Sequence, residues 1–490
     1  MPRSRQIRPR FLPVAVTLVL AAVAVLAWPN RWALFDRWVA PHLDKPFFVE
    51  GDCGGLPGLE SGAVCGRLYV DESRRGGGRG AVVLPVVRIA AAAGAPPEPV
   101  LYLGPGPGRR AIDPGGLDRQ RFPWLGGRGL VLVEPRGTGG AWPSLACPDL
   151  RRALLGEVDG GRQTLRAVSH GELADLVAAC RDRLAAAGVD LAAYGREEGV
   201  ADLVDLRRAL GIARWDLVAD GAGTALALGL LRADGGAVRA AALDGVRPPH
   251  LDYGADGAAA RFAAVTGCVN GFGEDWRAMA EKTRRRLAGT PERVVWTDTF
   301  LFKRTFAVTL GPDMFTDLVR TALTRMGDKH YVCEILVKAA EEVYDDLLAP
   351  FLVWMRDRDA ATAAAELSAA CGDGLVPPPA GVPVGLLAAL AVPRLQRFCD
   401  LWPRRASDPA ALAPVRSAVP VLLLSDTFDP TAPPLWAEHQ ATLLSRGFHV
   451  ALAAGRAGAA ARKRCAPLAI AAFLDDPQRR PAPDCLKSGN

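Results

Sequence analysis

The sequence lacks the residue patterns that hold metal ions and the concentrated charge that binds nucleic acid. Its six histidines are scattered, and none of its ten cysteines stands in Cys-x-x-Cys spacing, so we expect no metal site. The formal net charge is +6, but four arginines within the first ten residues carry most of it. The rest of the chain is close to neutral, whereas a nucleic-acid-binding protein presents a clustered basic face. We expect no nucleic-acid partner and no cofactor.

The N-terminal segment also has no acidic residue, and an uncharged, mostly apolar run of 18 residues, from Phe11 to Trp28, follows its arginines. This length is at the lower limit for crossing a bilayer and is long for a signal-peptide core. Arginines stay on the cytoplasmic side of a membrane. We therefore expect residues 1–28 to form a basic cytoplasmic stub and a transmembrane or signal-anchor segment, and residues 29–50 to form a linker. The remainder would be membrane-anchored and extracytoplasmic, in the periplasm or at the cell surface; the alternative is cleavage after residues 25–27 and secretion.

The even number of cysteines predicts disulfide bonds, because exported proteins meet an oxidising environment. Three pairs are close in sequence and flank expected elements of the fold: Cys53 with Cys65, Cys147 with Cys180, and Cys465 with Cys485. The other four cysteines allow three connectivities, which stay open here: Cys268, Cys333, Cys371 and Cys399.

Apolar runs alternate with amphipathic helical patterns along most of the chain. The predicted strands are 81–90, 100–103, 130–133, 215–218, 238–243, 419–424 and 450–453. Many are apolar on both faces, as in a parallel sheet with helices on each side. Helices are predicted near 169–187, 200–210 and 222–232, the first from a capping box at Ser169 to Glu172. This alternation indicates a doubly wound α/β domain.

The alternation stops between about residues 250 and 416, where the pattern is helical and aromatic with little strand signal. A helical cap inserted into an α/β domain is the natural interpretation. The expected organisation is a first part of the core at 51–249, the cap at 250–416 and the last part of the core at 417–490.

Four short segments occur in an order that resembles one enzyme group. They are 102–108 (YLGPGPG), 134–139 (EPRGTG), 215–224 (WDLVADGAGT) and 426–430 (DTFDP). The chain resembles the secreted tripeptidyl aminopeptidase and prolyl aminopeptidase group of α/β-hydrolases over about residues 53–485. The resemblance implies an oxyanion loop in the first segment, a nucleophile elbow in the third and the triad acid in the fourth.

The elbow departs from that pattern at the nucleophile itself. An elbow needs small residues on both sides of the nucleophile, on a sharp strand-to-helix turn. This alignment places Gly221 at the nucleophile position, with Ala219 and Gly223 as its small neighbours. Glycine has no nucleophilic atom. A shift by one residue would offer Asp220 as the nucleophile but would put Val218 where a small residue is needed.

The resemblance places the triad acid at Asp429 and the triad histidine at Arg456. Asp429 could also be a simple turn residue of an Asp-Pro pair. Arg456 stays protonated and cannot serve as a general base. His449 lies nearby but precedes or opens the last strand, so we interpret it as structural. If Asp429 keeps its place, we expect it to pair with Arg456.

The oxyanion loop is altered as well. The resemblance assigns it to Gly104, Pro105, Gly106 and Ala222. Pro105 stands where a glycine is usual, which removes one backbone N–H donor. Arg136 is a candidate binding residue, although its Arg-Gly turn fits loop bracing better.

The expected function is an α/β-hydrolase-fold protein without catalytic activity that binds a peptide or protein at the membrane. Two alternatives remain. One is an active serine-type or aspartate-type hydrolase or exopeptidase with unrecognised residues, and the other is a structural scaffold, because a fold alone does not establish a function.

Overall fold

The computed structural model describes residues 36, 39–53, 59, 62–75, 80–104, 106, 108–113, 117, 119–251, 276–326, 329–359, 362–372, 394–426, 429, 431–452, 456–482 and 485. The expected anchor at 1–28 lies outside these residues. Within them, no helix has both the length and the apolar character that a membrane crossing requires.

The main sheet has nine strands within the described residues, in the order β1-β2-β3-β5-β4-β8-β9-β12-β13. Their bounds are β1 Phe47–Gly51, β2 Val64–Asp71, β3 Ala81–Ile89, β4 Val100–Leu103, β5 Leu130–Val133, β8 Trp215–Asp220, β9 Val238–Asp244, β12 Val421–Asp426 and β13 Gly447–Leu452. The pairs from β1 to β5 are antiparallel, and those from β5 through β4, β8, β9, β12 and β13 are parallel. The predicted doubly wound, mostly parallel sheet is confirmed.

Helices cover this sheet from both sides. Helices α5 Arg196–Ala209, α6 Gly223–Asp234 and α16 Pro434–Thr442 cover one face, and α17 Arg456–Asp475 covers the other. Helices α3 Pro148–Leu155 and α4 His170–Ala186 pack on each other, and the short α15 Pro409–Leu412 has no buried residue. Along β12, Val421 and Leu423 join the apolar cluster on one face, while Leu422 and Leu424 join the cluster on the other. The amide of Glu172 donates to Ser169 Oγ over 3.1 Å, so the predicted cap does begin α4.

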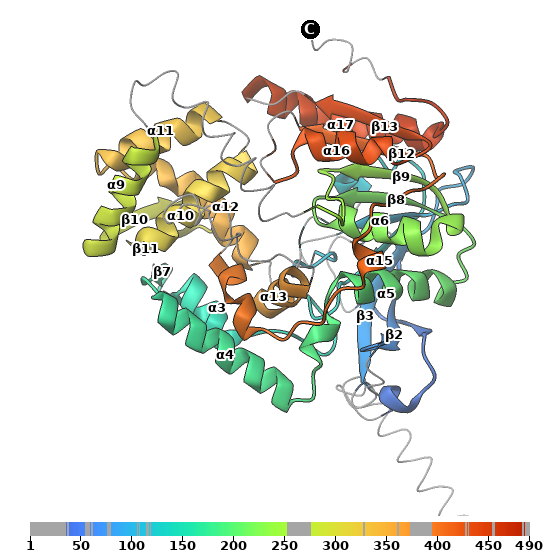
Figure 1. Cartoon of the computed structure of the whole chain (residues 1–490), viewed down its shortest axis with the longest axis horizontal. Helices are drawn as coiled ribbons and strands as arrows, with labels where there is room; N and C mark the ends of the chain where they lie inside the picture. Colours follow the sequence, from blue (N-terminus) through green and yellow to red (C-terminus); the bar gives the residue numbers. More distant parts are fainter. Residues whose placement is uncertain are drawn as a thin grey trace, which may run out of the picture.

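A second unit, in yellow and olive, lies beside the main sheet (Figure 1). It comprises α9 Trp276–Gly289, β10 Glu292–Asp298, β11 Arg304–Leu310, α10 Pro312–Thr321, α11 Lys329–Ala340 and α12 Leu348–Asp359. Helix α13 (Ala363–Gly372) and the 3-10 segment η7 (Arg394–Leu401) follow. The unit has its own apolar core, which includes Phe306, Phe315 and Phe351.

The expectation of a helical cap was incomplete, because β10 and β11 form an antiparallel hairpin inside it. Strand β11 also pairs in parallel with β7 (Arg162–Leu165), and β7 pairs with β6 (Glu157–Asp159), so the small sheet has the order β10-β11-β7-β6. Two of its four strands precede the insertion in sequence. Along β10 the buried Trp296 alternates with the exposed Val295 and Thr297. The sequence does not show this alternation, because Val294, Val295 and Trp296 are consecutive apolar residues, so periodicity gave no clear signal for the hairpin.

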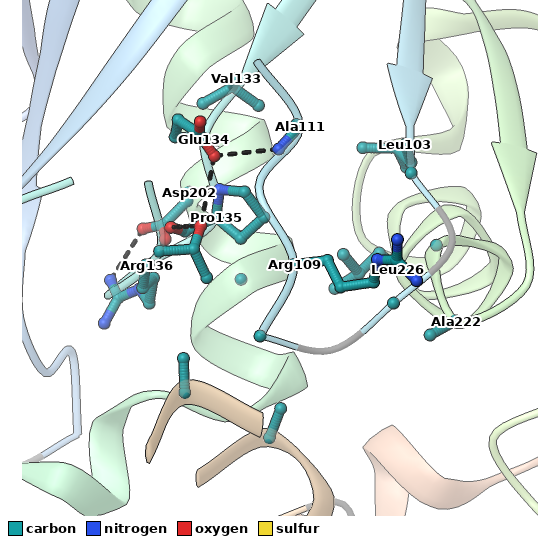
Figure 2. Close-up of a pocket in the computed structure, with 18 of the residues that line it drawn as sticks. Leu103, Arg109, Ala111, Val133, Glu134, Pro135, Arg136, Asp202, Ala222 and Leu226 are labelled. Atoms are coloured by element: carbon teal, nitrogen blue, oxygen red, sulfur yellow. Dashed lines mark hydrogen bonds and ion pairs between the residues drawn. The ribbon is translucent and has the colours of Figure 1, made fainter. Parts of the chain in front are cut away.

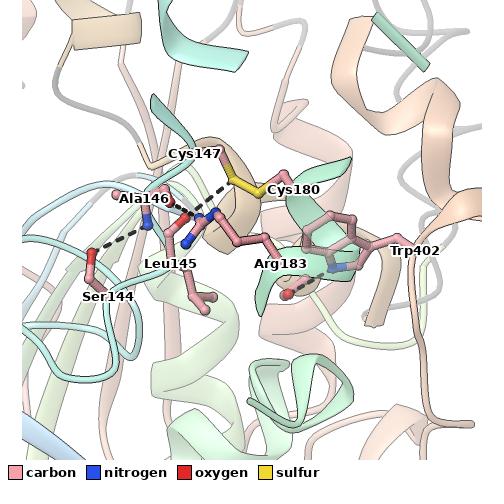
Figure 3. The surroundings of a disulfide bond; sticks show 8 residues. Ser144, Leu145, Ala146, Cys147, Cys180, Arg183 and Trp402 are labelled. Atoms are coloured by element: carbon pink, nitrogen blue, oxygen red, sulfur yellow. Dashed lines mark hydrogen bonds between the residues drawn. A yellow bond between two sulfur atoms is a disulfide. The ribbon is translucent and has the colours of Figure 1, made fainter. Parts of the chain in front are cut away.

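Four disulfides lie within the described residues. Three join the predicted partners Cys53–Cys65, Cys147–Cys180 and Cys465–Cys485, and the fourth is Cys371–Cys399. Figure 3 shows that Cys147–Cys180 ties the residue before α3 to α4, next to the contact of Arg183 with the Ala146 carbonyl. Cys333 is also disulfide-bonded, whereas Cys268 lies outside the described residues.

Candidate functional site

The turn from β8 into α6 has the geometry of a nucleophile elbow. Gly221 follows the last residue of β8 and has a φ of +54°, the left-handed conformation that glycine adopts at no steric cost. Its amide donates to the carbonyl of Asp244 over 2.8 Å, and its carbonyl accepts from the amide of Thr224 over 3.1 Å. Gly221 therefore stands at the apex, and Asp220 still belongs to the strand.

Gly223, two residues after the apex of the turn, must be small because the end of β4 packs directly against it. A Cβ on Gly223 would lie 2.7 Å from the carbonyl oxygen of Gly104 and closer still to that of Leu103. The end of β4 thus closes directly over the start of α6. Ala222, at the N-cap of α6, has no side-chain cap bond. The backbone of an elbow is present, but a hydroxyl or thiol at its apex is not.

The loop after β4 is held between α6 and α13. The amide of Thr362 donates to the carbonyl of Gly108 over 2.7 Å, and a Cβ on Gly108 would meet the amide nitrogen of Glu366 at 2.6 Å. Gly104 and Gly106 are part of this loop, while Pro105 lies outside the described residues. The loop that the resemblance assigned to oxyanion binding is therefore positioned by the helix that follows α12.

Asp429 lies after β12, as the resemblance implied. Its Oδ1 accepts from the amide of Thr431 over 2.7 Å, the hydroxyl of Thr431 over 2.6 Å and the amide of Ala432 over 3.1 Å. These bonds are those of a turn residue. Arg456 is the first residue of α17, after the last strand, but its side chain lies outside the described part of the structure. The pairing of Asp429 with Arg456 therefore stays a prediction.

His449 lies inside β13 rather than before it, so its expected place was wrong by a few residues. Its Nε2 is 2.8 Å from Ser425 Oγ, and its Nδ1 is 4.0 Å from a carboxylate oxygen of Glu438. Burial lowers the pKa of His449, against an opposing effect of Glu438, with Arg480 lowering it further. Ser425 is completely buried, so no substrate carbonyl can reach its hydroxyl.

The Ser425–His449 contact was missed from the sequence because the two residues are 24 positions apart on neighbouring strands. The strand register pairs Leu423, not Ser425, with His449. The contact is thus a diagonal one, which side chains can span between neighbouring strands. No local motif marks such a pair.

A cavity of about 130 Å³ opens beside the elbow. Its walls come from the loops after β4 and β5 and from α5, α6 and α13, and they are mainly apolar. Figure 2 shows Ala222 and Leu226 of the elbow helix on one side and the Glu134, Arg136 and Asp202 group on the other. The sequence had identified the first loop and Arg136, but not the contributions of α5 and α13.

Arg136 is fully engaged by the protein. Its Nε and Nη2 donate to the two carboxylate oxygens of Asp202 over 2.5 and 2.8 Å. The remaining N–H groups donate to the carbonyls of Asp71, Glu72 and Ala193. A guanidinium has five N–H groups, so none is left for a ligand. This arrangement braces β2, the loop after β5 and α5 against one another.

Glu134 supports the same wall of the cavity by holding the loop after β4. Its carboxylate accepts from the amides of Ala111 and Ile112 over 2.9 and 3.3 Å and from the hydroxyl of Thr138 over 3.2 Å. Burial raises the pKa of Glu134, and these hydrogen bonds oppose that effect. Among the described residues, no group of three or more His, Cys, Asp and Glu side chains is arranged to hold a metal ion.

Comparison with known proteins agrees with this geometry. Residues 388–485 match the family described as TAP-like protein. Together with the sheet order above, this match makes the chain an α/β-hydrolase-fold protein whose C-terminal part is TAP-like, which confirms the predicted resemblance there. No curated protein sequence matches the chain.

Similar solved structures are distant. A thermophilic esterase from Thermogutta terrifontis has a TM-score of 0.38 at 15% identity, over 84% of this chain and 99% of that one. A proline iminopeptidase-related protein from Thermus thermophilus has a TM-score of 0.33 at 16% identity, over 79% and 88% of the two chains. The strand order of the chain itself defines the fold.

Proposed function

We propose that this protein binds a peptide or protein ligand beside the Gly221 turn without hydrolysing it, while anchored to a membrane on its extracytoplasmic side. The observation that carries the proposal is Gly221 itself. It occupies the apex of an elbow whose backbone is intact, with a φ of +54°, yet it offers no side-chain atom. Loss of a nucleophile costs on the order of 10⁶ in turnover.

The cavity beside the turn supports a binding role. It is lined largely by apolar groups with a few polar ones, as ligand sites usually are. Its volume of about 130 Å³ is below the roughly 300–1,000 Å³ of typical small-molecule pockets. Such a space suits one apolar side chain of a longer ligand, so a peptide or a protein loop fits better than a whole small molecule.

Activity-based labelling tests the absence of catalysis. A fluorophosphonate probe needs a serine activated by a nearby base. We expect the purified protein not to react and not to hydrolyse aminoacyl-arylamides or simple esters above the background of heat-denatured protein. Labelling that disappears in Ser425→Ala, or turnover that disappears in Asp220→Ala, would instead support an active hydrolase. Labelling gained by Gly221→Ser combined with Arg456→His would identify the turn as the former nucleophile position.

Ligand-detected NMR tests the binding role. We expect saturation transfer to N-acetyl-leucinamide but not to N-acetyl-serinamide, because the cavity walls are apolar. Leu226→Arg places a charged chain in the cavity and should abolish the effect. Leu468→Arg, at an exposed position on α17, is the matched control and should leave it unchanged. Equal transfer to both amides, or none to either, would favour a structural scaffold.

The membrane anchor is tested separately. A reporter that is active only outside the cytoplasm, fused to the C-terminus, should be active. Activity of a reporter that works only in the cytoplasm would contradict the proposed topology.

A further inference from the structure

A second cavity lies where the α9–α12 unit meets the core. It has a volume of about 160 Å³, and its walls come mainly from α3, α10, α12, α13 and η7. In contrast to the cavity beside Gly221, this one is lined largely by charged side chains: Asp317, Arg320, Asp357, Arg358, Glu366 and Arg394. Together with the ion-pair partners named below, these residues are called the joint cluster.

Three ion pairs account for part of the joint cluster. They are Arg358 with Glu366 at 2.8 Å, Arg109 with Asp357 at 3.0 Å, and Arg397 with Asp313 at 3.2 Å. The first is bidentate, since both guanidinium nitrogens of Arg358 donate to the carboxylate. These pairs hold the loop after β4, α12, α13 and η7 together around the cavity.

Arg320 and Arg394 are less completely engaged. The side chain of Arg320 is 12% exposed, and within the described residues only Asp317 accepts from it, through Nη2. Arg394, whose side chain is 10% exposed, donates through Nη2 to the carbonyl of Val168. Its nearest carboxylate oxygen, on Asp313, is 3.8 Å away, beyond hydrogen-bond distance.

The unused donors of these two arginines are not enclosed in the packing. Each guanidinium has five N–H groups, and both side chains line the cavity. Of the buried nitrogens that lack a partner in the described part of the chain, none belongs to Arg320 or Arg394. Their remaining nitrogens are therefore not sealed in the packing, and both side chains line the cavity.

The side chains that line the cavity carry positive and negative charges in equal number. Three arginines (Arg320, Arg358 and Arg394) and three carboxylates (Asp317, Asp357 and Glu366) line it. Burial lowers the pKa of Arg320, Asp317 opposes this effect, and Arg397 and Arg358 lower the pKa further. Arg320 is thus a buried cation for which Asp317 is the only hydrogen-bonded carboxylate within the described residues.

We infer that this cavity binds the carboxylate of a ligand between Arg320 and Arg394. A planar guanidinium matches a carboxylate in geometry and forms charge-assisted hydrogen bonds to it. Asp317, Asp357 and Glu366 line the same cavity and repel a dianion such as phosphate more strongly than a monoanion. The inference goes beyond the proposed function, because it concerns a different cavity and holds whether or not the Gly221 turn is inert.

Isothermal titration of the full chain tests this site with N-acetyl-L-alanine. We expect saturable binding of this acid and at least about ten-fold weaker binding of N-acetyl-L-alaninamide, which lacks the carboxylate. Inorganic phosphate should bind more weakly than the acid. Arg320→Met and Arg394→Met should each weaken binding of the acid about ten-fold or more.

Arg356→Met is the matched control, because Arg356 is on α12 but is 59% exposed and does not line the cavity. It should change the affinity by less than about two-fold. Circular dichroism checks that each variant folds; if Arg320→Met does not, Arg320→Lys keeps the charge but loses the fork and should still weaken binding. Equal binding of acid and amide, tighter binding of phosphate, an equal effect of Arg356→Met, or no saturable binding by folded protein would each overturn the inference.

Discussion

The Gly221 turn and the Ser425–His449 contact each hold one half of what a serine hydrolase needs. At the turn, the backbone has the elbow conformation and opens beside a cavity, but no nucleophilic atom is present. Between β12 and β13, a hydroxyl and an imidazole lie 2.8 Å apart, but the serine is completely buried.

Hydrolysis requires a nucleophile with its base and also requires that the substrate can reach that nucleophile, and neither place meets both requirements. A hydrogen-bonded serine and histidine is a common way to satisfy polar groups within a sheet, and it needs no catalytic role. An elbow without a side chain can persist because its backbone also closes the packing of β4 against α6. The predictions below test whether these two places differ as described.

The largest expected effect concerns the wall beside the Gly221 turn. Arg136→Met should destabilise the protein by about 3–5 kcal/mol, because it breaks the buried pair with Asp202, which then keeps only Arg74, and it removes the donor to three buried backbone carbonyls. Chemical denaturation measures the loss. Arg152→Met, at an exposed ion pair, is the control and should stay within about 0.5 kcal/mol. A similar stability of the two variants would mean that Arg136 does not brace the wall.

A smaller effect tests the closed packing of the turn. Gly223→Ala should cost about 1–3 kcal/mol, because its Cβ would overlap the carbonyls at the end of β4. Gly236→Ala, where a Cβ would meet nothing within 4 Å, should change the free energy of unfolding by less than about 0.5 kcal/mol. Thermal melts of both variants make the comparison, and an unchanged Gly223→Ala would show that the elbow is looser than described.

The buried Ser425–His449 pair should contribute to stability and not to hydrolysis. Ser425→Ala should cost about 1 kcal/mol, because it leaves His449 Nε2 without its hydrogen-bond partner. Ser144→Ala, whose hydroxyl accepts one exposed hydrogen bond, should cost less. A fluorophosphonate signal that Ser425→Ala removes would break the contrast between the two places, because it would give the buried serine access.

The smallest effect is a pH dependence. Burial lowers the pKa of His449 in the folded state, so below pH about 6.5 the unfolded chain takes up the proton first. The contribution of His449 to stability is therefore complete above that pH and decreases as the pH falls toward the lowered folded-state pKa. Denaturation curves at pH 5 to 8 give the free energy of unfolding of the wild type and of His449→Gln. The difference between the two should be constant above pH about 6.5, and below that pH the wild type should lose stability relative to the variant. A constant difference across this range would contradict a neutral buried imidazole.

The sequence predicted the parallel part of the main sheet well, because buried parallel strands are short apolar runs between turn residues. The antiparallel edge strands β1 and β2 were not predicted, and β1 overlaps the end of the expected linker 29–50. The position of the turn apex could also be predicted, because Gly221, unlike Asp220, has small residues at the two flanking positions that an elbow requires. At Gly223 the elbow pattern requires a small residue, and in the structure the carbonyls of Leu103 and Gly104 leave no room for a Cβ.

The second unit was less predictable because its hairpin pairs with a distant strand. β10 and β11 are short strands within a helical stretch, and they are completed by β7, which precedes them by more than a hundred residues. The joint cluster was also unpredictable, because its arginines and carboxylates come from segments between Arg109 and Arg397 that only folding brings together.

The sequence by itself determined the alternation of strands and helices, the absence of a nucleophilic side-chain atom at Gly221 and the residues available for disulfides, because these depend on local pattern and residue chemistry. The tertiary structure decided which groups became accessible. It buried Ser425 against His449, saturated Arg136 with five acceptors and placed Arg320 and Arg394 in the wall of a cavity. Access and hydrogen-bond satisfaction depend on contacts between residues far apart in the chain, and those contacts exist only after the chain has packed.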